Sequence, residues 1–455
     1  MINLVGEDQL VPCVDGQERR YVSLDAAAST AALPSVAARV NDFLPWYSSV
    51  HRGAGWKSQL ATAEYEEART AILRFAGAER AECDDVAIIC RNTTEAINHL
   101  AYRLQLAPDD VVVTTVVEHH ANLLPWGRLA RRRYVECGAA GTFSVDDVAA
   151  ALEAHPAPRL LAVTGASNVT GWLPPIDEIA AAAHDRGVPV LVDAAQLAPH
   201  RPLPRDADYV AWSGHKMYAP FGSGALIGPR STFASGDPFL AGGGAVDLVD
   251  LDEVVWTDPP DREEAGSPNV LGAVALHAAI DALGELGWAR IDQHDRALSA
   301  QLHDGLAAID GVRLLGAAPE TLPVATFVVE GVPHALVAAR LSAEHAIGVR
   351  HGCFCAHPYL LRLLDLDEAE VAAYRAAVLA GDRSRMPGAV RASAGLSTRA
   401  DDVGRFLAAV AEIAAGGEPP VPYDLDPHTG DYWPHTADEA WSSASRRLGA
   451  SCARG

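Results

Sequence analysis

The sequence predicts an α/β fold, in which a large domain with a mostly parallel sheet is followed by a smaller α+β domain. Short β-branched and aliphatic runs alternate with Ala-rich amphipathic segments through the first half of the chain. That alternation is typical of parallel strands that helices cover on both faces. After a long Ala/Leu-rich stretch at 271–287, strand-like and helix-like segments are mixed, as in an α+β domain.

Four apolar runs are the candidate strands of the parallel sheet: 86–90, 111–117, 160–165 and 188–193. Between them, the segments TTEAINHLAYRL and IDEIAAAAHDRG predict helices, and the second ends at Gly187, a residue typical of helix C-caps. In the second half, TLPVATFVVEG predicts a strand, while HALVAARLSAEH and RFLAAVAEIAAG predict helices.

Changes in this pattern divide the chain into four predicted segments. These are an N-terminal segment that packs with the small domain (1–30), the large domain (31–285), the small C-terminal domain (286–415) and a C-terminal extension (416–455). The extension is rich in Pro, Asp, Tyr and Trp. Its aromatic residues offer more apolar surface than disordered segments usually have. We therefore expect it to lie on the surface of its own or a neighbouring subunit.

Net charge and cysteine content indicate which partners and which cellular location to expect. The 455 residues carry 36 Lys plus Arg against 59 Asp plus Glu, a formal net charge of -23, which repels nucleic acid and anionic membrane surfaces. The 7 cysteines are odd in number and mostly scattered, unlike a secreted disulfide framework. The N-terminus has no signal-peptide pattern, and no apolar run is long enough to span a membrane. A cytoplasmic protein is expected.

The run SGHK, which ends at Lys216, follows a strand-like segment and precedes the flexible stretch PFGSGALIG. A lysine at such a strand exit can lose solvation, which lowers its pKa and makes it an amine nucleophile toward an aldehyde. A surface turn is the commoner alternative for a single lysine.

Two further polar sites favour the catalytic interpretation of this lysine. Asp193 ends the run VPVLVD and is followed by Gln196, at the sheet edge where open α/β folds bind ligands. A carboxylate there can keep a pyridine nitrogen protonated. Thr93 and Thr94, in the run NTTE, lie between a strand and a helix, where hydroxyl and N–H groups can bind phosphate. A simple helix cap is an equal alternative for that run.

The chain resembles the class V aminotransferase family of fold-type I pyridoxal-phosphate enzymes, nearest to the branch of cysteine desulfurases and selenocysteine lyases. The resemblance covers about residues 21–412. It rests on ordered motifs: SLDAAAST, VHRGAGWKSQLATAEYEEAR, RNTTEAINHLA, EHHANLLPW, SNVTGWLPPI, VDAAQLAPH, SGHKMYAPFGSG, EAGSPN, VRHGCFCAHP and VRASAGLST. It implies the fold-type I architecture, pyridoxal 5'-phosphate as cofactor and a homodimer.

The resemblance also implies roles for single residues. Lys216 would bond the cofactor aldehyde, Asp193 would pair with the ring nitrogen and Gln196 would meet the ring hydroxyl. Ser213, His215 and Thr94 would bind the cofactor phosphate, and Ser267 would reach the phosphate of the other subunit. His119 would stack on the ring face and assist proton transfer. Asn168 would lie near the ring and substrate, and Arg391 would bind the substrate α-carboxylate.

The residue types give some of these roles physical support. The planar fork of Arg391 suits a bidentate carboxylate contact, although a structural ion pair is the usual alternative. His119 follows a strand, and an imidazole there can move protons near neutral pH, although a structural histidine is commoner. His51 and Arg52, in a Gly-flanked loop, are candidates for lining the substrate entrance, and anchoring of the loop is an equal alternative.

Cys355 determines the reaction type that the resemblance implies. In desulfurases a loop cysteine takes sulfur from the substrate as a persulfide and leaves alanine, and the run RHGCFCA places Cys355 at that position. This run departs from the usual desulfurase pattern and is similar to that of the molybdenum-cofactor sulfurase domain. Cys353 and Cys355 lack the spacing and the second pair of a zinc site, so no metal is expected. Packing in a buried turn and a redox role for Cys353 stay open.

We therefore predict a cysteine desulfurase-like enzyme that removes sulfur from L-cysteine or a related sulfur amino acid through an enzyme persulfide. A sulfur-acceptor protein is a candidate partner. One alternative is a carbon–sulfur β-lyase on a cysteine conjugate, which gives pyruvate and ammonia without need of Cys355. An epimerase or aminotransferase of the same family is another. A pseudo-enzyme that binds a sulfur-carrier protein is disfavoured by the intact Lys216, Asp193 and Arg391.

Overall fold

A seven-stranded sheet in the order β4-β10-β9-β8-β7-β5-β6 forms the centre of the protein. The computed structural model describes residues 2–51, 53–78 and 84–435. Neighbouring strands are parallel except where β10 pairs with β4 and β9. The strands are β4 (Asp85–Cys90), β5 (Val111–Thr115), β6 (Arg131–Val135), β7 (Leu160–Thr164), β8 (Val190–Asp193), β9 (Tyr209–Ser213) and β10 (Gly224–Pro229).

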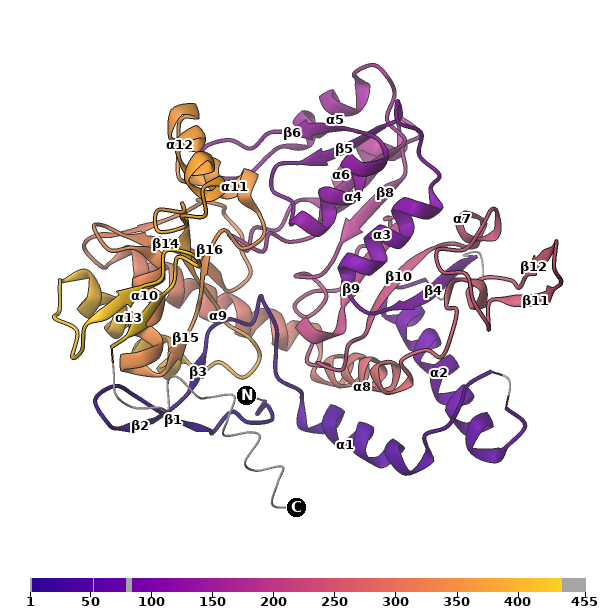
Figure 1. Ribbon diagram of the computed structural model, residues 1–455, viewed down its shortest axis with the longest axis horizontal. Coiled ribbons are helices and arrows are strands. Elements are labelled where there is room, and N and C mark those ends of the chain that lie inside the picture. The colour runs from indigo at the N-terminus through magenta and orange to yellow at the C-terminus, as the bar shows by residue number, and fades with distance from the viewer. Residues whose placement is uncertain (1, 52, 79–83, 436–455) are drawn as a thin grey trace.

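Helices cover both faces of this sheet (Figure 1). Alternate side chains of its strands enter two separate apolar clusters: Val113 and Leu161 belong to one, and Val112 and Leu160 to the other. Burial on both faces explains why these strands are continuous apolar runs. The helices of this part are α1 (Pro34–Phe43), η1 (Leu44–Trp46), α2 (Trp56–Phe75), α3 (Thr93–Arg103), η2 (His120–Asn122), α4 (Leu124–Leu129), α5 (Val145–Glu153), α6 (Ile176–His184), η3 (Gly214–Lys216), α7 (Arg230–Ala234), η4 (Asp261–Glu263) and α8 (Val270–Leu286).

A second, antiparallel sheet has the order β13-β14-β17-β16 and packs with helices from the C-terminal third of the chain. Its core contains large side chains such as Phe327 and Phe406, whose rings are 5.9 Å apart. The elements are α9 (Trp288–Ala307), β13 (Val312–Leu314), β14 (Val324–Val329), α10 (His334–His345), β15 (Ile347–Gly348), β16 (Arg350–Gly352), α11 (His357–Leu363), α12 (Glu368–Leu379), β17 (Ala389–Ser393) and α13 (Ala400–Ala414).

The N-terminal segment and the C-terminal extension both lie against this second part. The strand β3 (Val22–Ser23) pairs in parallel with β15. In the extension, the Tyr423 hydroxyl donates to Glu344 Oε1 of α10 at 2.9 Å. The remaining strands form three hairpins: β1 (Leu10–Pro12) with β2 (Glu18–Arg20), β11 (Val246–Val249) with β12 (Val254–Trp256), and β18 (Tyr423–Leu425) with β19 (Tyr432–Pro434). Residues 436–455 lie outside the described part, and the four segment boundaries stay a prediction.

The predicted fold class, α/β with a mostly parallel sheet followed by a smaller mixed part, is confirmed. The strand predicted at 111–117 ends at Thr115, because the Thr115 hydroxyl accepts from Val117 N at 3.1 Å and turns the chain. The antiparallel direction of β10 was not predicted, since an apolar run carries no information about strand direction.

None of the described helices is long and apolar enough on its own to cross a membrane. Helices α8 and α9 reach that length only as a pair, and they are bent by 82° where they meet.

Candidate active site

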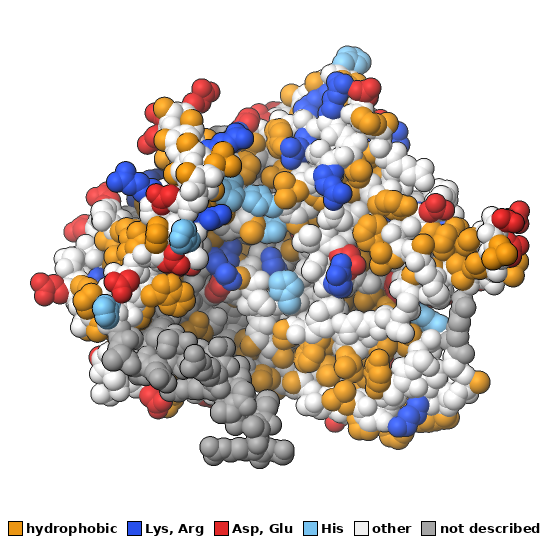
Figure 2. All heavy atoms as spheres, viewed as in Figure 1, with side chains coloured by type: hydrophobic (Ala, Val, Ile, Leu, Met, Phe, Trp, Pro, Cys, Tyr) orange, Lys and Arg blue, Asp and Glu red, His pale blue; other side chains and the backbone are white. Residues whose placement is uncertain are grey.

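A cavity of about 340 Å³ opens at the carboxyl ends of the parallel strands, next to β16 and β17 of the second sheet. Lys, Arg and His side chains gather around this hollow in the space-filling view (Figure 2). The predicted site residues that line it are Thr93, Thr94, His119, Asn168, Asp193, Gln196, Ser213, His215, Lys216, Cys355 and Arg391. The fold thus brings residues from distant parts of the sequence around one space.

Lys216 lies at the end of η3, just after β9, and faces Asp193 at the end of β8. Burial lowers the pKa of Lys216 to about 8, although the Asp193 carboxylate acts in the opposite direction. The neutral, nucleophilic form of this amine is therefore far more populated near pH 7 to 8 than in an ordinary lysine. Asp193 is 4% exposed, and its Oδ1 accepts from Ala195 N at 3.0 Å. Burial raises the pKa of this carboxyl group.

The first turn of α3 is fixed to the end of β9. Thr93 N donates to Ser213 Oγ at 2.8 Å, and the two hydroxyl oxygens are 2.7 Å apart. Asn92 caps the helix, with its side chain accepting from Glu95 N at 2.9 Å. The cap interpretation of the NTTE run is therefore correct, yet the exposed Thr94 lines the cavity as well. The positive end of an 11-residue helix thus faces the cavity, an arrangement that favours an anion.

His119 presents a neutral ring to the cavity. Burial, with the nearby Lys216 charge, lowers its pKa to about 3. Its Nδ1 accepts from Ala121 N at 3.0 Å, so the proton of the neutral ring is on Nε2. Near neutral pH this ring can stack on a ligand and donate a hydrogen bond from Nε2, and its role in proton transfer stays a prediction.

Arg391, on β17, is held between two acceptors. Its Nη1 donates to the Asn168 carbonyl at 2.8 Å, and its Nη2 donates to Asp25 Oδ1 at 3.1 Å. The buried Nε has no hydrogen-bond partner among the described residues. Burial lowers the pKa of Arg391 to about 10, which still leaves it protonated at neutral pH. Arg350, which also lines the cavity, pairs with the other oxygen of Asp25 at 2.8 Å.

Cys355 lies on a tight turn at the cavity. Ala356 N donates to the Cys353 carbonyl at 2.9 Å, and φ is 54° at Phe354 and 55° at Cys355. Two successive positive φ values define a type I′ turn, a conformation that is costly for residues other than Gly, Asn and Asp. The buried Phe354 ring lies 5.1 Å from the Arg391 guanidinium. The side chain of Cys355 is exposed.

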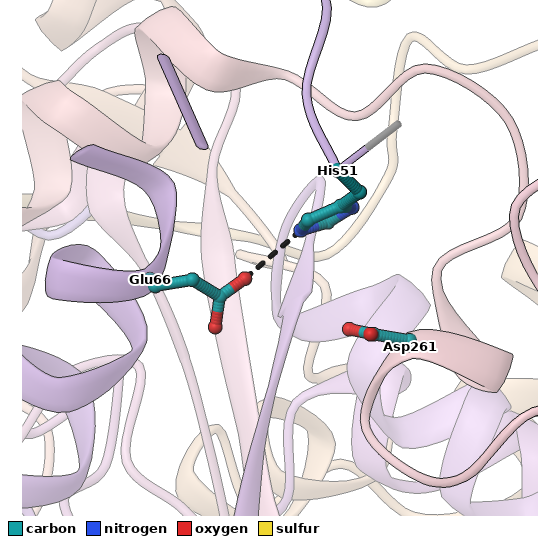
Figure 3. A group of neighbouring side chains, drawn as sticks. All are labelled: His51, Glu66 and Asp261. Carbon is teal, nitrogen blue, oxygen red and sulfur yellow. Dashed lines mark hydrogen bonds and ion pairs between the residues drawn. The ribbon is translucent and has the colours of Figure 1, made fainter. Parts of the chain in front are cut away.

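Two predicted site residues do not line the cavity in this chain. His51 Nε2 lies 2.9 Å from Glu66 Oε1, and Asp261 lies close to both side chains (Figure 3). Arg69 donates to both of these carboxylates, at 2.8 and 2.7 Å, so a metal ion there would have to compete with a guanidinium. Ser267 is exposed and outside the cavity, and Arg52 lies outside the described residues. Their roles stay predictions.

The sequence interpretation missed two carboxylates near the cavity, the half-buried Asp25 and the buried Glu118. Asp25 bridges Arg391 and Arg350, and its presence in the motif SLDAAAST was the available signal. Glu118, beside His119, accepts from Thr164 N at 3.0 Å and from the Asn122 amide at 2.8 Å. It therefore joins the ends of β5 and β7, and burial raises its pKa to about 8.

Comparisons with known proteins agree with this arrangement. The family model described as aminotransferase class-V matches residues 22–406. A probable cysteine desulfurase of Xylella fastidiosa is 35% identical over 346 residues, which are 73% of this chain and 82% of that protein. One from Halalkalibacterium halodurans is 36% identical over 357 residues, 76% of this chain and 86% of the relative.

Two solved structures share the fold. The apo structure of a cysteine desulfurase from Thermococcus onnurineus superposes with a TM-score of 0.77 at 31% identity, over 87% of this chain and 95% of that one. The cysteine desulfurase CsdA from Escherichia coli gives a TM-score of 0.73, with the same identity and coverage.

Proposed function

This chain belongs to the aminotransferase class-V family, and we propose that it is a pyridoxal-phosphate-dependent cysteine desulfurase. Membership of the family, predicted from the ordered motifs, is confirmed. The observation that carries the proposed reaction is the position of Cys355. An exposed thiol on an anchored turn lines the same cavity as a lysine of lowered pKa, a buried aspartate and a buried arginine.

The cavity residues fit pyridoxal phosphate in three respects. The Lys216 amine lines the cavity and has no hydrogen-bond partner among the described residues. Among the described residues Asp193 accepts a hydrogen bond at Oδ1 alone, which leaves Oδ2 for a protonated ring nitrogen. The start of α3, with Thr94, offers N–H and hydroxyl donors for the phosphate. When bound, the cofactor supplies an aldehyde and an electron-withdrawing pyridinium ring.

The chain's own groups divide the work on a bound amino acid. Arg391 holds the α-carboxylate, since it lines the cavity and stays protonated at neutral pH. Lys216 Nζ takes the proton from the substrate α-carbon, because its lowered pKa makes the neutral, basic amine accessible near neutral pH. Asp193 keeps the ring nitrogen protonated. Cys355 Sγ then attacks the substrate sulfur, the carbon–sulfur bond breaks, and the products are a Cys355 persulfide and alanine.

We also propose a homodimer in the cytosol, with an acceptor for the persulfide sulfur. The dimer proposal is supported by the exposed position of Ser267, outside the cavity of its own chain, since the family resemblance assigns this residue to the phosphate of the other subunit. L-cysteine is the proposed substrate.

Replacing Cys355 by serine tests this function. We expect alanine formation from L-cysteine to fall by at least about 100-fold, since a hydroxyl is a far weaker nucleophile toward sulfur than a thiol. The measurement is alanine released per minute with a thiol reductant present, for wild type and Cys355→Ser. Cys137→Ser, a partly buried cysteine that does not line the cavity, is the matched control. Unchanged alanine formation in Cys355→Ser would refute the proposal.

Replacing Arg391 by lysine tests the carboxylate contact. A lysine keeps the charge beside Asp25 but loses the planar fork. We expect kcat/KM for L-cysteine to fall about 10- to 100-fold, the effect of losing one charged hydrogen bond, with most of the change in KM. Arg313→Lys, at an exposed position of β13, is the control. A kcat/KM within a factor of about two of wild type would count against this contact.

A further inference from the structure

We infer that Cys353 is a resolving cysteine, which attacks the Cys355 persulfide, forms a Cys353–Cys355 disulfide and releases sulfide from the enzyme. The inference deepens the proposed function and rests on it, because the persulfide is the product of that reaction. It assigns a catalytic step to a side chain that packing alone would otherwise explain.

The turn holds the two thiols close together. Cys353 and Cys355 are its first and third residues. A turn with φ near 55° at its second residue leaves such Cα atoms about 5.5 Å apart, within the roughly 4.4–6.8 Å that disulfides span. Burial raises the pKa of the Cys353 thiol, and the backbone N–H of Cys355 partly offsets that rise.

The turn is also fixed in place. The Phe354 carbonyl accepts from Asn168 Nδ2 at 2.7 Å, the Cys355 carbonyl accepts from His120 N at 2.7 Å, and the Cys353 carbonyl accepts from Ala356 N. The Phe354 side chain is 7% exposed. With three successive carbonyls held, Cys355 has little freedom to carry its sulfur away from the cavity, while Cys353 stays beside it.

The step balances without an external oxidant. The Cys353 thiolate attacks Sγ of the Cys355 persulfide, a sulfur–sulfur bond forms between the two cysteines, and the bond to the outer sulfur breaks. That sulfur leaves with the electron pair, takes up a proton and departs as hydrogen sulfide. The outer sulfur is reduced, the Cys353 sulfur is oxidised by the same amount, and the oxidation state of the Cys355 sulfur does not change. A thiol reductant must then open the disulfide before the next turnover.

The test is the fate of sulfur in one turnover. The cofactor-loaded protein is mixed with one equivalent of L-cysteine without reductant, quenched with an alkylating agent and analysed for alanine, free sulfide and peptide mass. We expect nearly one sulfide per alanine, and a peptide containing residues 353 and 355 that is about 2 Da lighter and resists alkylation. In Cys353→Ala and Cys353→Ser the sulfide-to-alanine ratio should fall at least about 10-fold, and the peptide should retain a sulfur of about 32 Da.

Cys137→Ala is the matched control, with a sulfide-to-alanine ratio like that of wild type. The inference is overturned if wild type retains the added sulfur on Cys355 while Cys353 is alkylated. A second arm uses inorganic polysulfide on the cofactor-free protein, which places sulfur on the exposed Cys355 without any cysteine turnover. Formation of the 353–355 cross-link with polysulfide supports the inference even if no alanine forms from L-cysteine. If L-cysteine gives alanine but no cross-link forms, the inference is refuted and the proposed function stays intact.

Discussion

Lys216→Ala is expected to lower the rate of alanine formation by about 10⁴-fold or more. The variant removes both the amine that bonds the cofactor aldehyde and the base that takes the substrate proton, and each of these roles has a large effect on rate. Lys216→Arg should be equally inactive, because an arginine stays protonated and cannot act as either group. Activity within about 100-fold of wild type in both variants would contradict the assignment.

The small number of lysines allows the cofactor-binding lysine to be identified directly. The sequence contains only two lysines, Lys57 and Lys216. Lys57 is exposed, and its Nζ donates to the Pro45 carbonyl at 2.8 Å. After borohydride reduction of the loaded protein, the cofactor mass should be found on the Lys216 peptide in wild type and in Lys57→Ala. It should be absent from that peptide in Lys216→Ala.

The pH dependence of cofactor capture follows from the same lysine. Only the neutral amine reacts with an aldehyde, so the capture rate should rise as pH increases through about 8, the pKa of Lys216, and level off above it. With the ordinary lysine pKa of 10.5, the midpoint of this rise would lie near pH 10.5. Stopped-flow absorbance of the cofactor-free protein mixed with pyridoxal phosphate measures the midpoint.

Asp193→Asn is expected to have the second largest effect. An amide cannot keep the ring nitrogen protonated, and loss of one partner of a buried ion pair costs about 3–5 kcal/mol, which corresponds to about 10²- to 10⁴-fold in rate. The same change removes the negative charge that raises the pKa of Lys216, so the midpoint of cofactor capture should move to lower pH.

Two measurements check the Asp193 prediction independently: kcat with L-cysteine, and the pH midpoint of cofactor capture. Asp177→Asn, an exposed residue in the first turn of α6, is the matched control and should change neither quantity. A capture midpoint that stays at the wild-type pH would mean that Asp193 and Lys216 do not interact as the structure indicates.

Site residues at the ends of predicted strands could be identified from the sequence. Asp193 follows an apolar run that is buried on both faces, and Lys216 follows another, so the parallel sheet alone brings both to one edge. The strand interiors were predictable for the same reason. Their ends were less so, because the end of β5 depends on one side-chain hydrogen bond, from Val117 N to the Thr115 hydroxyl.

Other parts of the site depend on contacts between distant segments. Asp25 reaches Arg391 across 366 positions of the sequence, and no local pattern predicts such an ion pair. The turn at Phe354 and Cys355 has left-handed backbone without glycine. This conformation is maintained by Asn168, His120 and Arg391, which lie elsewhere in the chain, so the usual turn signals are missing. His51 could not be placed from its Gly-flanked loop, because its partner Glu66 lies on α2.

The fate of the carbon skeleton of L-cysteine tests the central claim most directly. The loaded wild-type protein is given labelled L-cysteine and a thiol reductant, and the products are identified by mass spectrometry. A desulfurase should give one alanine and one sulfide for each cysteine consumed, with no pyruvate. Pyruvate and ammonia in place of alanine would contradict the account, because they would identify a β-lyase in which the thiol of Cys355 takes no part.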